Sequence, residues 1–212
     1  TAEVGLRYSN VRRSLGAVDD EKGTAATAVL TTNTFEGRTV PQLRGTFDFG
    51  FALPPHASIW SRTAIGAARG DRTDSAANFY FGAFGNNYVD HKDEQRYREY
   101  QSLPGLEINE AGGRNFVKSL VEWTVPPVRF SRAGTPGFYL TWVRPSVFVS
   151  GLVTNLDARA ARRKVTNAGA QLDFRLSALS SLDLTLSVGG AVAFTDGSRP
   201  RREAMISLKV LR

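Results

Sequence analysis

Residues 42–53 read QLRGTFDFGFAL, and their side chains alternate between two kinds. Phe47, Phe49 and Phe51 stand at odd positions, whereas Arg44 and Asp48 stand at even ones. A period of two indicates a β-strand, in which successive side chains point to opposite faces. Three phenylalanines on one face and opposite charges on the other are typical of a strand between lipid and a wet lumen. We therefore predict that the three phenylalanines face lipid and that Arg44 and Asp48 face the lumen.

The same alternation returns over residues 168–177 and 182–194, and again in a closing run at 206–210. It predicts lipid-facing side chains at Leu172, Phe174, Leu184 and Leu186, and lumen-facing ones at Asp173 and Arg175. A run over residues 116–125 adds two charges, Lys118 and Glu122, which we also expect to point into the lumen. Apolar and polar faces thus recur along the whole chain.

Further runs of similar length cover residues 3–11, 24–35, 57–68, 78–88, 116–125 and 138–150. Together the runs predict about ten strands, each of about ten residues, which is the length a tilted strand needs to cross the hydrocarbon layer. We expect an all-β fold, an antiparallel up-and-down transmembrane β-barrel, with residues 1–212 as a single domain. We also expect this domain to be the C-terminal part of a longer protein. The barrel is then either formed by these residues alone or completed by strands outside them.

The composition excludes other classes of protein. No apolar run approaches the roughly 20 residues of a membrane-spanning helix, which excludes a helical membrane protein. The absence of cysteine excludes a disulfide framework and cysteine-bound zinc. The net charge of +7 comes from positive residues scattered over the predicted strands and turns. Since they form no basic face, nucleic acid is not an expected partner.

The connections between the predicted strands differ in length. Short ones cover residues 37–41, 54–56 and 178–181, and longer ones cover 11–23, 70–77 and 154–164. We expect the two kinds to alternate, with the short turns on the periplasmic side. The longest connection, residues 89–114, exceeds the length of an ordinary loop and predicts a functional role.

From residue 102 onward the sequence holds three short motifs. Leu103, Pro104, Gly105 and Leu106 form the first; residues 112–115 (GGRN) followed by 119–126 (SLVEWTVP) form the second; residues 147–151 (VFVSG) form the third. They resemble the outer-membrane protein assembly factor superfamily, the bacterial surface-antigen barrels that include assembly insertases and two-partner secretion transporters. The resemblance covers roughly the C-terminal half. It implies a barrel with a loop folded into the lumen, whose tip is Leu103, Pro104, Gly105 and Leu106, and an inward glutamate at Glu122.

Two positions depart from the family pattern. The arginine of the family's loop tip is replaced, with Pro104 or Leu103 in its place, and the acid of the strand segment is missing at Ser150. In the family these two residues pair inside the barrel. Their joint loss leaves no unpaired charge in a confined lumen, which is physically coherent.

The predicted function is an integral outer-membrane β-barrel of a Gram-negative-type bacterium. It would serve protein or solute passage (transport or protein assembly), or anchor a periplasmic assembly. The expected partners are outer-membrane lipid and lipopolysaccharide, together with periplasmic or other membrane protein subunits. No cofactor, metal or enzymatic activity is expected, so no catalytic residue is assigned.

Two alternatives remain open at this stage. One is a barrel enzyme, a protease or lipid hydrolase, which would need His56 or His91 within reach of an acid or a serine. The other is a soluble all-β binding domain, which would pack apolar rather than charged side chains inside its sheet. Trp60, Trp123 and Trp142, with Tyr88 and Tyr139, are expected to anchor at the lipid head groups. Residues 159–164 carry a cluster of positive charges that could meet phosphates of lipopolysaccharide.

Overall fold

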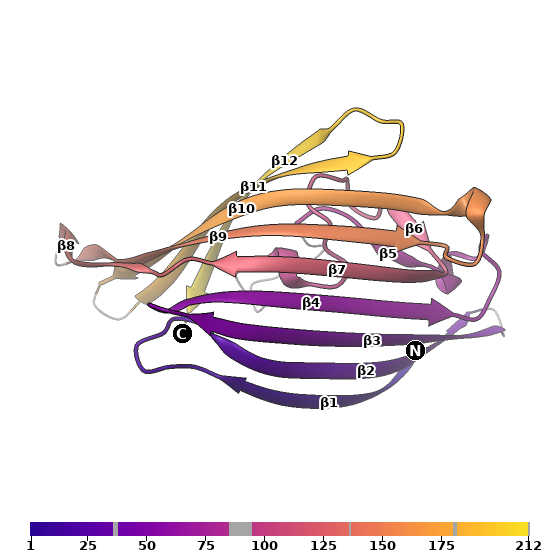
Figure 1. The fold of residues 1–212 in the computed structure, drawn as a ribbon, viewed down its shortest axis with the longest axis horizontal. Helices are drawn as coiled ribbons and strands as arrows, with labels where there is room; N and C mark the ends of the chain where they lie inside the picture. Colours follow the sequence, from indigo (N-terminus) through magenta and orange to yellow (C-terminus); the bar gives the residue numbers. More distant parts are fainter. Residues whose placement is uncertain (36–37, 85–94, 136, 180–181, 212) are drawn as a thin grey trace.

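A single large antiparallel sheet makes up most of the molecule (Figure 1). The computed structural model describes residues 1–35, 38–84, 95–135, 137–179 and 182–211. The strands of the sheet follow one another in chain order: β1 (Ala2–Arg12), β2 (Lys22–Phe35), β3 (Arg38–Leu53), β4 (Ala57–Ala68), β7 (Asn115–Thr124), β9 (Phe138–Thr154), β10 (Arg163–Ala178), β11 (Leu182–Thr195) and β12 (Arg201–Leu211). A tenth strand, β8 (Val128–Thr135), pairs with β9 beside this path. The prediction of an all-β antiparallel fold is confirmed.

The remaining elements are short. Strands β5 (Phe79–Phe81) and β6 (Ala111–Gly113) form a separate two-stranded sheet. Three 3-10 turns, η1 (Ser75–Ala77), η2 (Arg96–Arg98) and η3 (Arg159–Ala161), lie in the connections. Of the strand predicted over residues 78–88, the structure confirms residues 79–81, because β5 ends at Phe81 and Ala83 adopts a positive φ of 52°. Residues 85–88 lie outside the described part of the chain. Strand β8 lies between two predicted runs and was not expected. Within the described residues, no helix is long and apolar enough to cross a membrane.

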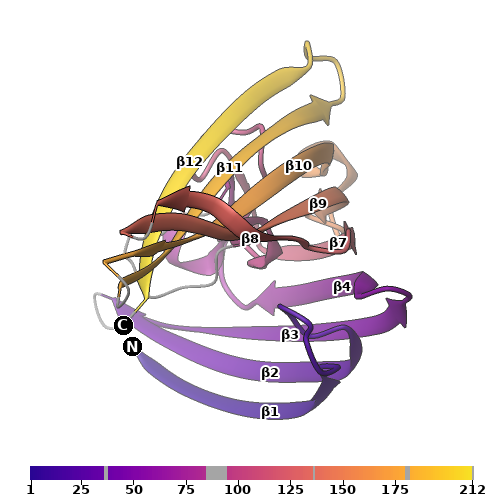
Figure 2. The ribbon, with the colours of Figure 1, turned by 90° about the vertical axis from the view of Figure 1, so that its left-hand side faces the viewer.

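The sheet is curved, and its two faces differ in chemistry (Figure 2). The convex face exposes large apolar side chains: Phe47, Phe49 and Phe51 are 53%, 49% and 45% exposed. The row continues over the other strands with Leu43, Ile65, Val121, Val149, Leu172, Val188 and Leu208, all exposed. Phe174, Leu184 and Leu186 share this face by their position in the strands but are half-buried. All seven residues predicted to face lipid thus lie on one face of the sheet.

The concave face carries the opposite composition. Strand β7 buries every second residue, and among these are Lys118 and Glu122. Strands β9 and β10 likewise bury Arg144, Ser150 and Asp173. The covered face of the sheet therefore mixes charged and polar side chains with apolar ones such as Phe116, Leu120 and Phe148, whereas the exposed face is formed mainly by apolar side chains.

An inner segment, here residues 79–84 and 95–113, lies on the concave side and covers the middle of the sheet (Figure 2). Its apolar residues, Phe79, Phe81, Leu103, Leu106 and Ala111, form one cluster with Ala64, Phe116, Leu152, Val165 and Ala193 of the sheet. The Phe116 ring packs edge to face against the rings of Phe79 and Phe81, with centroid distances of 4.9 Å and 4.7 Å. Edge-to-face packing of this kind is favoured by the ring quadrupole, so this small core attaches the segment firmly to β7.

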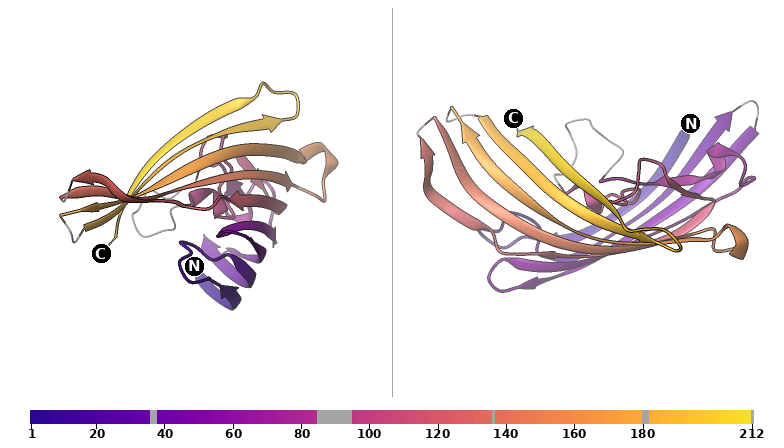
Figure 3. Two further views of the ribbon diagram at one scale, coloured as in Figure 1. Left: turned by 60° about the vertical axis from the view of Figure 1, so that its left-hand side comes forward. Right: turned by 90° about the horizontal axis from the view of Figure 1, so that it is seen from above.

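The sheet is open at both sides (Figure 3). Within the residues that the structure describes, β1 and β12 pair only with β2 and β11, and not with each other. Because the nine strands of the main path are antiparallel throughout, β1 and β12 run in the same direction. The described strands therefore form a trough rather than a closed barrel.

The expected alternation of short and long connections is wrong. Consecutive turns of an antiparallel meander must lie at opposite ends of the sheet, so the turn over residues 37–41 lies opposite the turn over 54–56. The longer 11–23 connection lies beside the 54–56 turn, since the Nδ1 atom of His56 is 3.0 Å from Oε1 of Glu21. We call the two ends the Pro54 end and the Gly70 end. Residues 36–37 and 180–181 are outside the described chain.

Candidate functional site

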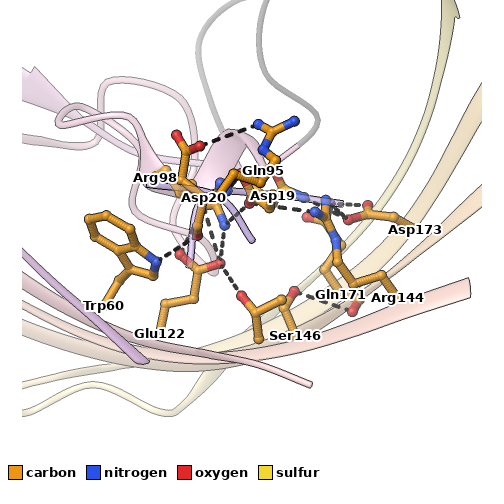
Figure 4. A network of polar contacts seen from close by, with 12 residues as sticks. Asp19, Asp20, Trp60, Gln95, Arg98, Glu122, Arg144, Ser146, Gln171 and Asp173 are labelled. Atoms are coloured by element: carbon orange, nitrogen blue, oxygen red, sulfur yellow. Dashed lines mark hydrogen bonds and ion pairs between the residues drawn. The ribbon is translucent and has the colours of Figure 1, made fainter. Parts of the chain in front are cut away.

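A network of ion pairs and hydrogen bonds occupies the centre of the concave face (Figure 4). Its strand residues are Arg62 on β4, Glu122 on β7, Arg144 on β9 and Asp173 on β10. The period of two places all of them on the same side of the sheet. The inner segment adds Gln95, Tyr97 and Arg98, and the β1–β2 connection adds Asp19 and Asp20.

Glu122 is the first centre of this network. It is fully buried, and its carboxylate accepts hydrogen bonds from Nη2 and Nε of Arg98 at 2.6 Å and 2.8 Å. The Tyr97 hydroxyl donates to the same carboxylate at 2.7 Å, and Nε of Arg62 lies 3.6 Å away. A buried carboxylate is stable only when partners of this kind satisfy its oxygens. Glu122 therefore fixes the η2 turn against the sheet.

Asp173 is the second centre and is also fully buried. Its oxygens accept hydrogen bonds from Nη2 of Arg144 at 3.0 Å and from Nε2 of Gln95 at 2.8 Å. Gln171 and the Ser187 hydroxyl complete the set at 2.6 Å and 2.7 Å. The inner segment is thus tied to β10 as well as to β7.

Asp19 joins the two centres. Its Oδ2 atom is 2.8 Å from Nη2 of Arg98 and 3.4 Å from Nη1 of Arg144. The neighbouring backbone is also fixed, because Nε1 of Trp60 donates to the carbonyl of Asp20 at 3.1 Å. Two segments that enter the trough from opposite ends therefore meet at Asp19.

The charge on Asp19 sets the pH range of this contact. Burial alone would raise its pKa, but the Arg98 and Arg144 guanidiniums outweigh it and hold the pKa of the carboxyl well below its usual range. A depressed pKa in the folded state stabilises at pH values above the unfolded pKa of about 3.9, and this contribution is lost as the pH falls further. We expect the contact to be fully stabilising from neutral pH down to about pH 4, and its contribution to decrease below that pH as the unfolded state takes up a proton first.

Asp19→Asn should loosen the β1–β2 connection, because the substitution removes one charge from a contact with two arginines. The expected loss is about 1–2 kcal/mol, typical of charged hydrogen bonds that are partly exposed. Limited proteolysis within residues 13–21 of the full-length protein would measure it as faster cleavage. Asp20→Asn is the matched control, since its carboxylate contacts only the exposed Arg13 at 3.4 Å. Equal cleavage rates in both variants would contradict the role assigned to Asp19.

The tip of the inner segment is held by two side chains of the sheet, Glu203 and Asn167. Glu203 on β12 accepts hydrogen bonds from the backbone amides of Gly105 at 2.7 Å and Phe84 at 3.1 Å. Asn167 donates to the carbonyl of Pro104 at 2.8 Å and is itself hydrogen-bonded to the Ser150 hydroxyl. Gly105 has a φ of 97°, and a Cβ there would meet Ala193 at 2.7 Å. The tip Leu103, Pro104, Gly105 and Leu106 therefore lies inside the trough, as the resemblance implied.

The six charges predicted to face a lumen all lie on the concave side but do not form one set. Arg62 joins Asp48 to Glu122, and Asp173 is linked to Glu122 through Arg144, Asp19 and Arg98. Lys118 binds backbone carbonyls of the inner segment instead. Arg44 lies over the Tyr100 ring at 4.0 Å, and Arg175 pairs with Asp183 at 2.8 Å, away from the network.

A cavity of about 1060 Å³ opens between this network and strands β1 to β4. Its walls carry six arginines, namely Arg7, Arg13, Arg44, Arg62, Arg98 and Arg144, and four acids, Asp19, Asp20, Asp48 and Glu99. The arginine excess makes this cavity suited to polar, predominantly anionic content.

Other sequence expectations meet a different structure. Trp60 is 2% exposed on the concave face and does not reach the head-group level that we expected for it. Its ring packs over Gly50 across the strand pair, where a Cβ would come within 2.4 Å of the ring. Trp123 is exposed on the convex face, whereas Trp142 lies on the concave side, with its ring 5.4 Å from the Arg144 guanidinium. Tyr88 lies outside the described residues.

His56 meets the distance that the enzyme alternative requires, since its Nδ1 atom is 3.0 Å from Oε1 of Glu21. This pair lies at a turn of the Pro54 end, and His56 is not among the residues that line the cavity. His91 lies outside the described residues. Over the described ranges, no group of three histidine or acidic side chains could hold a metal ion.

No protein-family model, curated protein or solved structure matches this chain.

Proposed function

We propose that this chain forms the wall of an outer-membrane β-barrel of the surface-antigen type, with two inward segments held across its lumen. The observation that carries the proposal is the distribution of side chains over the two faces. A sheet in water rarely leaves a face of large apolar side chains exposed, whereas here such a face is exposed and the opposite face buries charges such as Lys118, Glu122 and Asp173 beside its apolar residues. Lipid around the convex face and water inside the trough account for both.

The open edges support a larger barrel. Unpaired backbone groups are not tolerated in the hydrocarbon layer, so β1 and β12 need strand partners there. Since these two strands run in the same direction, direct closure would require a parallel pair. A barrel that is antiparallel throughout needs an odd number of further strands between them. Those strands would come from another part of the same polypeptide or from a partner subunit.

The connections suggest an orientation. The longest connection, between β4 and β7, lies at the Gly70 end together with the η3 connection, whereas the Pro54 end holds the tight turn of residues 54–56, the connection after β1 and strand β8. Outer-membrane barrels place their longer loops outside the cell and their short turns in the periplasm. On this basis the Gly70 end faces the cell exterior.

The interior suggests what the barrel does. Glu122, Asp173 and Asp19 hold both inward segments by charged contacts, which can reform after the segments move, rather than by a covalent link. Passage of a protein segment or solute would require these contacts to open. The carbonyl of Pro104 at the tip is hydrogen-bonded to Asn167, which is hydrogen-bonded in turn to Ser150. Ser150 is the strand position where the resembled family has an acid. Neutral hydrogen bonds take over that connection here.

Single cysteines in the full-length protein test the membrane placement, and the 212 residues contain no cysteine that would interfere. Phe49→Cys and Val149→Cys place a thiol on the convex face, and Thr46→Cys places one on the concave face. After labelling with an environment-sensitive fluorophore in vesicles, we expect nitroxide lipids to quench the two convex positions and not position 46. Quenching of all three alike, or of none, would contradict the barrel. Extraction of the unmodified protein without detergent would favour the soluble alternative.

A further inference from the structure

A groove of about 440 Å³ lies on the convex face near the Gly70 end. Its walls are apolar along most of their length, with Leu30, Leu43 and Ala67 beside Pro41 and Ala68. Arg69, which follows β4, and Arg114, which precedes β7, line one end of it, which we call its mouth. The groove thus combines apolar side chains with two arginines.

The strand register explains the shape of the groove. Leu30, Leu43 and Ala67 lie side by side across β2, β3 and β4, so two large side chains adjoin a small one. Leu30 and Leu43 are 46% and 56% exposed, and nothing in the described chain covers them. The depression at Ala67 is therefore open to whatever surrounds the convex face.

Arg69 follows Ile65 and Ala67 on the same face and emerges where the apolar positions of β4 end. It is exposed, and among the described residues it has no carboxylate partner. Arg114, by contrast, pairs with Asp157, which also pairs with Arg72 at 2.6 Å. Asp157 is thus shared by two guanidiniums, and Arg69 is the cation of this groove that forms no ion pair within the described residues.

Two acids lie near Arg69, in the pocket on its other side, and both are engaged. Asp74 accepts a hydrogen bond from the amide of Ala76 at 2.9 Å, which caps η1, and Asp71 accepts one from the amide of Thr73 at 3.2 Å. Their carboxylates stabilise the loop that follows β4. The convex side of Arg69 remains available to an anion.

We propose that this groove binds a phosphorylated lipid of the outer leaflet, with an acyl chain along Leu30, Leu43 and Ala67 and its phosphate on Arg69. The inference rests on the proposed function, which places the convex face in lipid and the Gly70 end outside the cell. A guanidinium can bind a phosphate through two parallel hydrogen bonds, and its aliphatic stem can lie along apolar surface. Arg114 supports the phosphate from the second wall of the mouth.

Other cations at the same end show what is particular to Arg69. Lys164 on β10 and Arg202 on β12 also lie on the convex face beyond the apolar positions and are exposed. Neither lines this groove. If positive side chains were attracted to head groups in general, Arg69, Lys164 and Arg202 would contribute equally to phosphate binding. A specific site in the groove requires Arg69 in particular.

The test uses the full-length protein in detergent, titrated with lipid A and with dephosphorylated lipid A. We expect the unmodified protein to bind lipid A about tenfold more tightly, the factor that one good charged contact supplies. Arg69→Gln should reduce this preference to less than about twofold, whereas the control Arg202→Gln should leave it unchanged. Native mass spectrometry of the lipid-bound fraction reports the affinity directly.

A second variant tests the apolar part. Ala67→Phe fills the groove and keeps both arginines, so it should weaken lipid A and its dephosphorylated form by a similar factor. Retention of the phosphate preference in Arg69→Gln, or its equal loss in Arg202→Gln, would overturn the site. Displacement of lipid A by millimolar inorganic phosphate would show a free-anion site instead. If the cysteine probes report lipid on the convex face while this preference is absent, the inference fails and the proposed barrel stands.

Discussion

Phe47→Arg should prevent the protein from assembling into the outer membrane. Phe47 lies near the middle of β3 and is 53% exposed on the convex face. A guanidinium at that depth in lipid destabilises a barrel by about 2–4 kcal/mol, which is a large part of the stability of a typical domain. The measurement is the fraction of full-length protein in outer-membrane fractions that migrates as a folded, heat-modifiable band. We expect a small residual fraction.

Thr46→Arg is the matched control for this prediction. It introduces the same side chain at the residue before Phe47 in β3, but on the concave face, where Thr46 lines a cavity with Asp48 and with four cations, namely Arg44, Arg62, Arg98 and Lys118. We expect far more assembly than for Phe47→Arg, because a charge that stays in water is repelled by its neighbours only weakly compared with the cost of a charge in lipid. Equal assembly of the two variants would be incompatible with a lipid-facing convex surface.

Glu122→Gln should give the second large effect, a loss of about 3 kcal/mol of unfolding free energy. Removing one partner of a buried ion pair typically costs roughly 3–5 kcal/mol because the other charge is left without compensation. The lower end of this range applies here, because Arg98 still forms its ion pair with Asp19 and Arg62 still forms its ion pair with Asp48. Urea unfolding in micelles, followed by the fluorescence of the buried Trp60, would measure the change.

Asp183→Asn provides the comparison for Glu122. Asp183 also pairs with an arginine, Arg175, at 2.8 Å, but its side chain is 50% exposed. Exposed pairs contribute about 0–1 kcal/mol, so this variant should unfold at nearly the same urea concentration as the unmodified protein. A midpoint for Glu122→Gln no lower than that of Asp183→Asn would show that the Glu122 network does not stabilise the inward segments.

Much of the sheet could be predicted because a period of two is a local property of the sequence. Residues 42–53 gave both a strand and the assignment of its two faces, and the structure places Phe49 and Asp48 on opposite sides. The same reasoning misplaced Trp60. Its position near a strand end suggested a head-group anchor, but the alternation within β4 and the space left by Gly50 decide its face.

The site was less predictable because its centre depends on residues without periodicity. Arg62 and Arg144 follow the alternation of their strands and could have been assigned to the concave face. Asp19 and Arg98 lie in connections, where no pattern tells which way a side chain points. Their meeting depends on how far two segments from opposite ends reach into the trough. The inward path of residues 103–106 was expected only from the family resemblance.

In the proposed barrel, Glu203 would couple the edge strand β12 to the segment held in the lumen. The residue belongs to β12, an edge strand, and its carboxylate accepts hydrogen bonds from the backbone amides of Gly105 and Phe84. A partner strand that repositions β12 would thereby pull on the tip of the inward segment. Conversely, withdrawal of the tip would leave a carboxylate without its donors at the edge of the sheet. Whatever joins that edge is therefore in a position to sense whether the lumen is occupied.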